Sequence, residues 1–379
     1  MMKQQTSLVF TGDIGFDKYM DLRWKDEDLV SDEVLDFLHS GDHLIINVEG
    51  PLSKQEKVMR ENGVAALTHS MNPEVTEFFD RIGADVWNIC NNHIMDAGPK
   101  GMEDTLKEAK RCGVKTLGAG MNIFEAKEPV IFNEAGGIGL IGAGYQRACR
   151  KADENTPGCV SLSDLDTMRE QIALIKKSCR WCVVVAHGGE EFTALPSPYT
   201  RDRYMEFLEM GADIVVAHHP HVPMNYETFD DGKIIFYSLG NFVFDTDYQR
   251  SQFNTETGLF LKINFAENEY FFEPFGIKID REAERVVAGE LPAIFTDVRA
   301  DEYEKLKYLA AKMFIENTKR QLIYLKPAVF NNATEEEFVN NFYHQIFSDA
   351  TCRKMGFSLV LHGKRSGGDR RHFSDLHSP

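Results

Sequence analysis

The sequence predicts a layered α/β or α+β fold, in which two mixed β-sheets pack together with helices outside. Two observations carry this prediction. Short β-rich segments alternate with amphipathic helical segments over much of the chain, as in parallel β–α–β units. Two other stretches, 129–142 and 224–265, contain short β-rich segments separated by turn signals, as in antiparallel hairpins.

The alternating segments follow from hydrophobic period and from helix start and stop signals. Pro73 marks the start of one helix, and Gly113 marks the end of the next. Expected strands cover 7–11, 43–48, 84–90, 181–186 and 212–217. Expected helices cover 73 to about 83, 101–113, 161–178, 199–210 and about 300–325. Each of these strands runs into polar residues.

Length and composition indicate a folded protein with either one large domain and an appendage or two ordinary domains. The chain has 379 residues, of which 43% are hydrophobic and 27% charged, which are ordinary globular values. We expect a main domain over residues 1–290, a helical or mixed extension over 291–365 and a flexible tail over 366–379.

Several function classes are disfavoured. A net charge of −17 opposes non-specific nucleic-acid binding. No apolar run approaches the ~20 residues that cross a bilayer, and no signal peptide opens the chain, so we expect a cytoplasmic protein without a membrane anchor. Seven cysteines without a CxxC pair argue against a disulfide framework or a thiolate zinc site. No GxSxG elbow is present. The glycine-rich stretch 136–142 is expected inside a hairpin, not in a nucleotide-binding loop.

Polar residues with metal-ligand chemistry follow five of the strands. The carboxyl ends of strands gather at one edge of a layered α/β fold, so these groups are expected to converge. Carboxylate, amide and imidazole groups suit Mn, Fe, Zn or Mg, in one or two sites. The five groups are Gly12-Asp13, Asn47-Val48-Glu49, Asn91-Asn92-His93 with Asp96, His187 with Glu190 and Glu191, and His218-His219-Pro220-His221.

The most specific local signal is the pair His219 and His221. In an extended backbone, which Pro220 favours, both imidazoles point to one side, whereas His218 points to the other. The alternative is a histidine-rich surface loop. Because a strongly apolar strand delivers the pair, we favour a binding site.

In their order along the chain, six motifs resemble those of the bacterial CapA or PgsA capsule-synthesis family, over about residues 7–265. That family is associated with poly-γ-glutamate and is similar to the calcineurin-like metallophosphoesterases. The resemblance implies a four-layer sandwich of two mixed sheets flanked by helices. The motifs are Gly12-Asp13, Asn47-x-Glu49-Gly50-Pro51, Asn91-Asn92-His93 with Asp96-x-Gly98 and Gly101, His187-x-Gly189-x-Glu191, His218-His219-Pro220-His221-Val222 and Tyr237-Ser238-Leu239-Gly240-Asn241-Phe242.

The resemblance also implies roles. Glu49, or alternatively Asn47, stands at the position of the carboxylate that bridges two metal ions. His93, oriented by Asp96, would stabilise or protonate the departing oxygen. The residues assigned to the substrate side, where they would bind the substrate, are Asn47, Glu190, Glu191 and Asn241. The remaining metal ligands implied are Asp13, Asn92, His187, His219 and His221.

Two residues depart from the phosphoesterase pattern. Gly15 stands where a histidine is usual, and Glu49 where an aspartate is usual. Three functions therefore remain open: hydrolysis of a phosphoester or related bond, a non-catalytic role in capsule assembly or polyanion binding, and hydrolysis of a γ-glutamyl amide. The expected partner is an anionic polymer or a phosphorylated small molecule.

Overall fold

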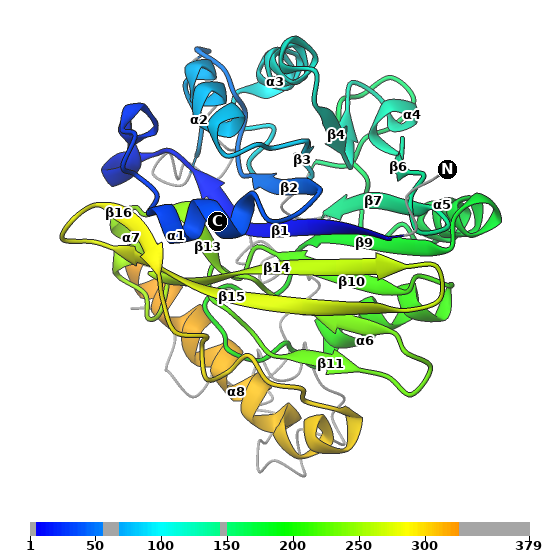
Figure 1. The fold of residues 1–379 in the computed structure, drawn as a ribbon. Coiled ribbons are helices and arrows are strands. Elements are labelled where there is room, and N and C mark those ends of the chain that lie inside the picture. Colours follow the sequence, from blue (N-terminus) through cyan, green and yellow to red (C-terminus); the bar gives the residue numbers. More distant parts are fainter. Residues whose placement is uncertain (1–4, 56–67, 145–149, 326–379) are drawn as a thin grey trace, which may run out of the picture.

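The computed structural model describes residues 5–55, 68–144 and 150–325, and two large sheets form its centre (Figure 1). The first has eight strands, with the order β16-β15-β14-β1-β2-β3-β4 and with β13 also paired to β1. Strands β2, β3, β4 and β13 run parallel in this sheet, whereas β14 to β16 are antiparallel. The bounds are β1 Gln5–Gly15, β2 His43–Val48, β3 Val86–Asn88, β4 Lys115–Leu117, β13 Asn241–Phe244, β14 Thr257–Ala266, β15 Tyr270–Asp280 and β16 Arg285–Ala288.

The second sheet has six strands in the order β11-β12-β10-β9-β7-β6. Its central strands are parallel and its two edge strands are antiparallel, so both sheets are mixed, as the sequence predicts. The glycine-rich stretch lies in the β6–β7 hairpin, which confirms the turn interpretation. The bounds are β6 Val130–Phe132, β7 Ile138–Gly144, β9 Trp181–His187, β10 Ile214–His218, β11 Tyr226–Thr228 and β12 Ile234–Phe236; a small third sheet pairs β5 Ala119–Gly120 with β8 Gly158–Cys159.

Alternation along the strands builds the layers. In β1, Leu8 and Phe10 face the second sheet, whereas Val9 faces a helical layer. In β9, Val183 faces the first sheet and Val184 faces the opposite helices. Helices α1 Asp32–Leu38, α2 Thr76–Arg81 and α3 Gly98–Cys112 cover the first sheet, and α5 Leu165–Ser178 and α6 Pro198–Glu209 cover the second. The predicted four-layer sandwich is confirmed.

Sequence rules explain most element ends. Helix α6 begins with Pro198 after Ser197, whose hydroxyl caps the Thr200 amide, and α3 ends at Gly113 with φ 73°. Strand β1 is longer than expected because β13 pairs with its far half. At Gly12, a Cβ would lie 2.2 Å from the Gly240 carbonyl oxygen, so only glycine allows this close approach.

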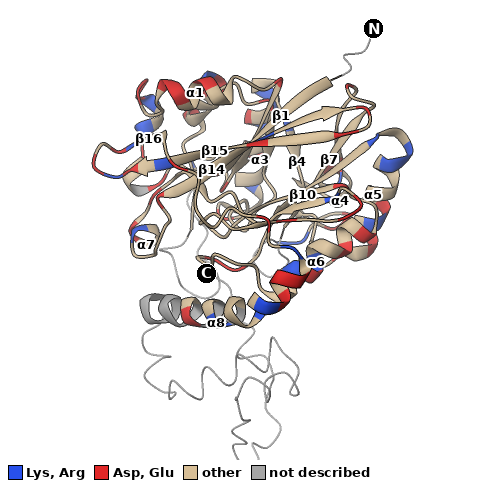
Figure 2. Cartoon of the chain, turned by 60° about the horizontal axis from the view of Figure 1, so that its bottom comes forward, with Lys and Arg blue, Asp and Glu red and all other residues tan. Residues whose placement is uncertain are grey.

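3₁₀ turns, short helices and the long helix α8 are the remaining described elements. In the part of the chain that the structure describes, no helix has the length and apolar composition needed to cross a bilayer. The five cysteines there are free thiols. Figure 2 shows acidic and basic residues interspersed along α1, α5 and α6. The bounds are η1 Lys18–Met20, η2 Arg23–Lys25, η4 Pro73–Val75, α4 Ile123–Ala126, α7 Asp247–Arg250 and α8 Ala300–Leu325.

Helix α8 packs on the sandwich beside α6. The Tyr303 hydroxyl donates to the Pro196 carbonyl at 2.9 Å, and the Asn317 amide donates to the Phe192 carbonyl. The domain boundary near residue 290 stays a prediction. Most of the expected extension, residues 326–365, and the whole expected tail, 366–379, lie outside the described residues.

Candidate metal centre

Strand ends of both sheets deliver polar side chains to one place. Asp13 lies in β1, Glu49 follows β2, and Asn92 follows β3 by a short loop. From the second sheet, His187 ends β9, and the segment after β10 brings two further histidines. All six predicted metal ligands are buried: Asp13, Glu49, Asn92, His187, His219 and His221.

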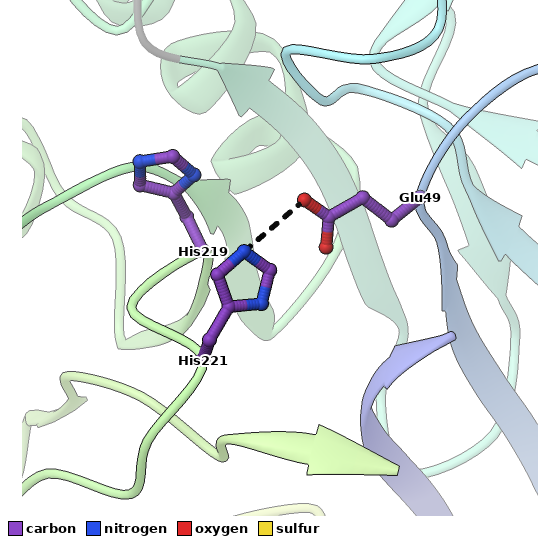
Figure 3. Close-up of side chains that lie close together, drawn as sticks. All are labelled: Glu49, His219 and His221. Atoms are coloured by element: carbon purple, nitrogen blue, oxygen red, sulfur yellow. Dashed lines mark ion pairs between the residues drawn. The ribbon is translucent and has the colours of Figure 1, made fainter. Parts of the chain in front are cut away.

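The Glu49 carboxylate is the common member of this cluster. Its Oε1 atom lies 3.6 Å from Nε2 of His221 and 3.7 Å from Nε2 of His187. Two groups of side chains have ligand atoms mutually within 4.8 Å and could hold a metal ion, Asp13–Glu49–His187 and Glu49–His219–His221. Figure 3 shows the second group, with the carboxylate directed at His221. Glu49 therefore has the shared position expected of a bridging carboxylate.

Among the described residues, both oxygens of Glu49 are buried without a hydrogen-bond donor. Burial raises the pKa of Glu49 well above its ordinary value, and the charge of Asp13 adds to the effect although His221 opposes it. A buried carboxylate without donors is costly, and a bound cation is the usual solution. Two carboxylates, three imidazoles and an amide fit a divalent metal ion.

The histidines respond to the same burial in opposite ways. Burial and the neighbouring His219 lower the pKa of His187 well below its ordinary value, which favours the neutral form that ligates metals. Burial also acts to lower the pKa of His221, but Glu49 and Asp13 outweigh it and raise that pKa to about 10. Burial alone would raise the pKa of Asp13, yet its contact with His221 brings it below the ordinary value. Asp13, Glu49 and His221 thus form one electrostatically linked group.

The register of the first sheet places four polar side chains in a row on neighbouring strands, next to the predicted metal ligands. Asp13 pairs with Asn241 on β13 and with Asn47 on β2, and Asn47 pairs with Asn88 on β3. The Asn88 amide donates to Asn47 at 2.8 Å, and the Asn47 amide donates to Asp13 Oδ1 at 2.8 Å. On the other side, Asn241 Oδ1 lies 3.0 Å from Nδ1 of His221 and so turns Nε2 toward Glu49. Asn47 and Asn241, expected on the substrate side, thus contact predicted ligands, and this geometry favours an orienting role.

The two neighbouring glutamates, also expected on the substrate side, differ. Glu190 is buried, and its carboxylate accepts hydrogen bonds from the Ser197 amide and hydroxyl and from the Thr200 hydroxyl, so it anchors the start of α6. Glu191 lies at the centre, with Oε1 3.9 Å from Nε2 of His219. Only Glu191 of the pair lies close to the predicted ligands.

His93 and Asp96 form a close pair at the edge of the cluster. Nδ1 of His93 lies 2.6 Å from Oδ2 of Asp96, and Nε2 lies 3.9 Å from Oε1 of Glu49. His187 Nε2 contacts Asn92 Oδ1 at 2.8 Å. The loop after β3 thus places a predicted ligand and an imidazole with a carboxylate partner side by side.

The expected extended backbone of the His219–His221 segment is wrong. His219 has φ 99° and His221 has φ 57°, in the left-handed region that such residues seldom adopt. Strand β10 ends at His218, whose Nε2 lies 2.9 Å from the Thr11 carbonyl and so links the two sheets. The two predicted ligands still face one carboxylate, but turns bring them there. Backbone strain of this kind persists where surrounding contacts enforce it, often at binding sites.

The unusual glycine at position 15 has a structural explanation. A Cβ at Gly15 would lie 2.0 Å from Cε2 of Phe244, so the phenyl ring fills the space that a side chain there would need. The Phe244 ring stacks on His221 at 5.0 Å with an interplanar angle of 1°, and Phe192 stacks on His221 at 5.8 Å. Sequence reasoning missed both phenylalanines, since Phe244 lies just beyond the recognised motif.

Comparisons with known sequences identify the family that the motifs resemble. The sequence profile of the family described as "Bacterial capsule synthesis protein PGA_cap" matches residues 7–246. The "PGA biosynthesis protein CapA" of Bacillus subtilis (strain 168) is 31% identical over 263 residues, which span 68% of each chain. The "Capsule biosynthesis protein CapA" of Bacillus anthracis is 32% identical over 232 residues, 59% of this chain and 56% of that one.

Solved structures resemble this chain only weakly. TT1561 of Thermus thermophilus has a TM-score of 0.38 at 8% identity, over 75% of this chain and 98% of that one. The purple acid phosphatase PPD1 of yellow lupin has a TM-score of 0.36 at 12% identity, over 78% and 54%. The sequence comparisons carry the assignment: the chain belongs to the bacterial capsule synthesis protein family, PGA_cap.

Proposed function

We propose that this protein acts in the biosynthesis of a capsule-type anionic polymer such as poly-γ-glutamate, and that it hydrolyses a phosphoester or related bond at a divalent metal centre. The observation that carries the metal centre is Glu49, buried, without hydrogen-bond donors among the described residues and shared by two groups of possible ligands. The names of the Bacillus relatives support the capsule polymer. A cytoplasmic location stays a prediction.

Six side chains would hold Mn, Fe, Zn or Mg in one or two sites. A bound divalent ion would supply positive charge that neutralises developing charge on phosphoryl oxygens and activates water for attack. Asn47 and Asn241 fix the orientation of Asp13 and His221 through the hydrogen bonds described above. The six residues are Asp13, Glu49, Asn92, His187, His219 and His221.

His93 is the proposed proton donor. With Nδ1 held by Asp96, its Nε2 faces the Glu49 side of the cluster and can deliver a proton to the departing oxygen. Hydrolysis balances when the oxygen of water bonds to phosphorus, the P–O bond to the leaving group breaks, and His93 gives its proton to that leaving oxygen. One of the two water protons then restores His93, and the other stays on the phosphoryl product or passes to solvent. The burial of His93 limits the access of bulk water to this proton.

The test uses elemental analysis of the purified protein and turnover of bis-p-nitrophenyl phosphate after loading with each metal. We expect stoichiometric metal, and a loss of about 10²–10⁴-fold in turnover for His93→Ala with metal content retained. His43→Ala is the matched control, because His43 also lies near a carboxylate, with Nδ1 3.6 Å from Asp85, at the opposite end of β2. Metal-free protein under all loading conditions, or equal activity in both variants, would refute the proposal.

A second candidate is hydrolysis of a γ-glutamyl amide by the same residues. The Bacillus subtilis relative is named a PGA biosynthesis protein, which makes the polymer itself a candidate substrate. Incubation of metal-loaded protein with poly-γ-glutamate, followed by sizing of the products, tests this directly. Shortened polymer would support amide hydrolysis, whereas binding of intact polymer without any phosphodiester turnover would favour the non-catalytic assembly role.

A further inference from the structure

A second pair of an imidazole and a carboxylate lies beside His93. Nδ1 of His69 lies 2.6 Å from Oδ2 of Asp17, and the His69 side chain is 10% exposed. Asp17 follows β1 and His69 precedes η4, so the two residues come from different parts of the chain. Sequence motifs gave no reason to single out either residue.

Several contacts place His69 at the metal centre. Its ring meets the His93 ring edge to face, with centroids 4.2 Å apart, and meets Phe244 at 4.9 Å. The His69 amide donates to Asp96 Oδ2 at 2.8 Å, the same oxygen that contacts His93 Nδ1. A Cβ at Gly50, directly after Glu49, would lie 3.2 Å from the His69 Cβ. The His69 imidazole thus contacts His93, which in turn lies beside Glu49.

The chemistry of the pair differs from simple packing. A ring that only filled space between His93 and Phe244 would need no carboxylate at Nδ1. When both ring nitrogens carry protons, Nδ1–H donates to Asp17 and the ring offers Nε2–H to an anionic ligand. The Asp17 carboxylate fixes the ring orientation through its contact with Nδ1.

We propose that His69, positioned by Asp17, binds a phosphoryl oxygen of the substrate beside His93. This inference rests on the proposed hydrolase function. His69 would hold an oxygen that does not leave, while His93 protonates the oxygen that does. Loss of His69 is therefore expected to weaken substrate binding more than the chemical step.

The test measures inorganic phosphate binding to metal-loaded protein by calorimetry, and KM and kcat for bis-p-nitrophenyl phosphate. His69→Phe keeps an aromatic ring against His93 and Phe244 but removes both ring nitrogens. We expect phosphate to bind about tenfold more weakly, equivalent to about 1.4 kcal/mol, and KM to rise by a similar factor while kcat changes less than about threefold. Asp17→Asn should weaken phosphate binding in the same direction. If His69→Phe does not fold, the phosphate affinity of Asp17→Asn tests the proposal by itself.

His43→Phe is the matched control, since His43 also lies near a carboxylate and packs on an aromatic ring, Phe132, away from the centre. It should bind phosphate like the wild type. Equal phosphate affinity in the wild type, His69→Phe and Asp17→Asn would overturn this inference alone. A metal-loaded wild type that neither binds phosphate nor hydrolyses the diester would overturn the proposed function and this inference with it.

Discussion

Glu49→Gln is expected to separate metal binding from folding. The Gln side chain keeps the size of Glu49, but removes the carboxylate that both groups of possible ligands share. Since even residues that only orient ligands contribute about 10–100-fold to metal affinity, loss of the shared carboxylate should cost at least about 100-fold, or about 2.7 kcal/mol. Both oxygens of Glu49 lack hydrogen-bond donors among the described residues, so the metal-free fold should tolerate a neutral side chain of the same size. We therefore expect metal-free stability within about 1 kcal/mol of wild type.

Glu227→Gln provides the opposite case. Glu227 is equally buried, but the Arg201 guanidinium donates to it at 2.6 and 2.8 Å and the Tyr237 hydroxyl at 2.8 Å. Removing this charge leaves Arg201 uncompensated and should cost about 3–5 kcal/mol of stability while metal affinity stays unchanged. Calorimetry with Mn or Zn and urea unfolding in EDTA measure the two quantities. The reasoning is refuted if Glu49→Gln binds metal like the wild type, or if both variants lose the same property.

Three further outcomes are expected. Asn241→Leu removes the amide oxygen that lies 3.0 Å from Nδ1 of His221 and leaves Asp13 as the remaining neighbour of that nitrogen, at 3.3 Å. It should weaken metal binding about 10–100-fold in calorimetry; unchanged affinity would argue against an orienting role. Gly15→Ala forces the Phe244 ring to move and should lower the free energy of unfolding in urea by about 1–3 kcal/mol. The same substitution should cost less when it is made in the Phe244→Leu variant. Equal costs in the two backgrounds would contradict this contact. The folded protein binds a proton at His221 more tightly than the unfolded chain, with a pKa raised from 6.5 to about 10. The metal-free wild type should thus lose stability as pH rises from about 6.5 to 10. Urea unfolding in EDTA over this pH range measures the loss, and a stability that does not change with pH would contradict a proton on His221.

Much of the fold follows from the sequence, because the buried strands are short apolar runs bounded by turn and cap signals. Strand β9, with its buried Val183, Val184 and Val185, is one example. The two mixed sheets follow from the alternation of crossover and hairpin segments. The full length of β1 does not follow from the sequence. Its pairing with β13 depends on a long-range contact between Gly12 and Gly240 that no local pattern encodes.

The site shows the same division. Convergence of Asp13, Glu49 and His187 is predictable because the carboxyl ends of the strands meet at one edge. The turn that delivers His221 is not predictable from the apolar strand before it, since tertiary contacts with Asp13 and Phe244 hold its left-handed backbone. The family resemblance assigns Asn47 to the substrate side, which stays a prediction, whereas the hydrogen bond from its amide to Asp13 favours an orienting role.

The central claim is a metal centre organised around Glu49. Anomalous diffraction from crystals of the metal-loaded protein, recorded at the absorption edge of the metal, tests it most directly. The account predicts a peak about 2.0–2.2 Å from a Glu49 carboxylate oxygen and within bonding distance of imidazole nitrogens of His187, or of His219 and His221. Crystals grown in excess metal that show no anomalous peak beside Glu49 would contradict it.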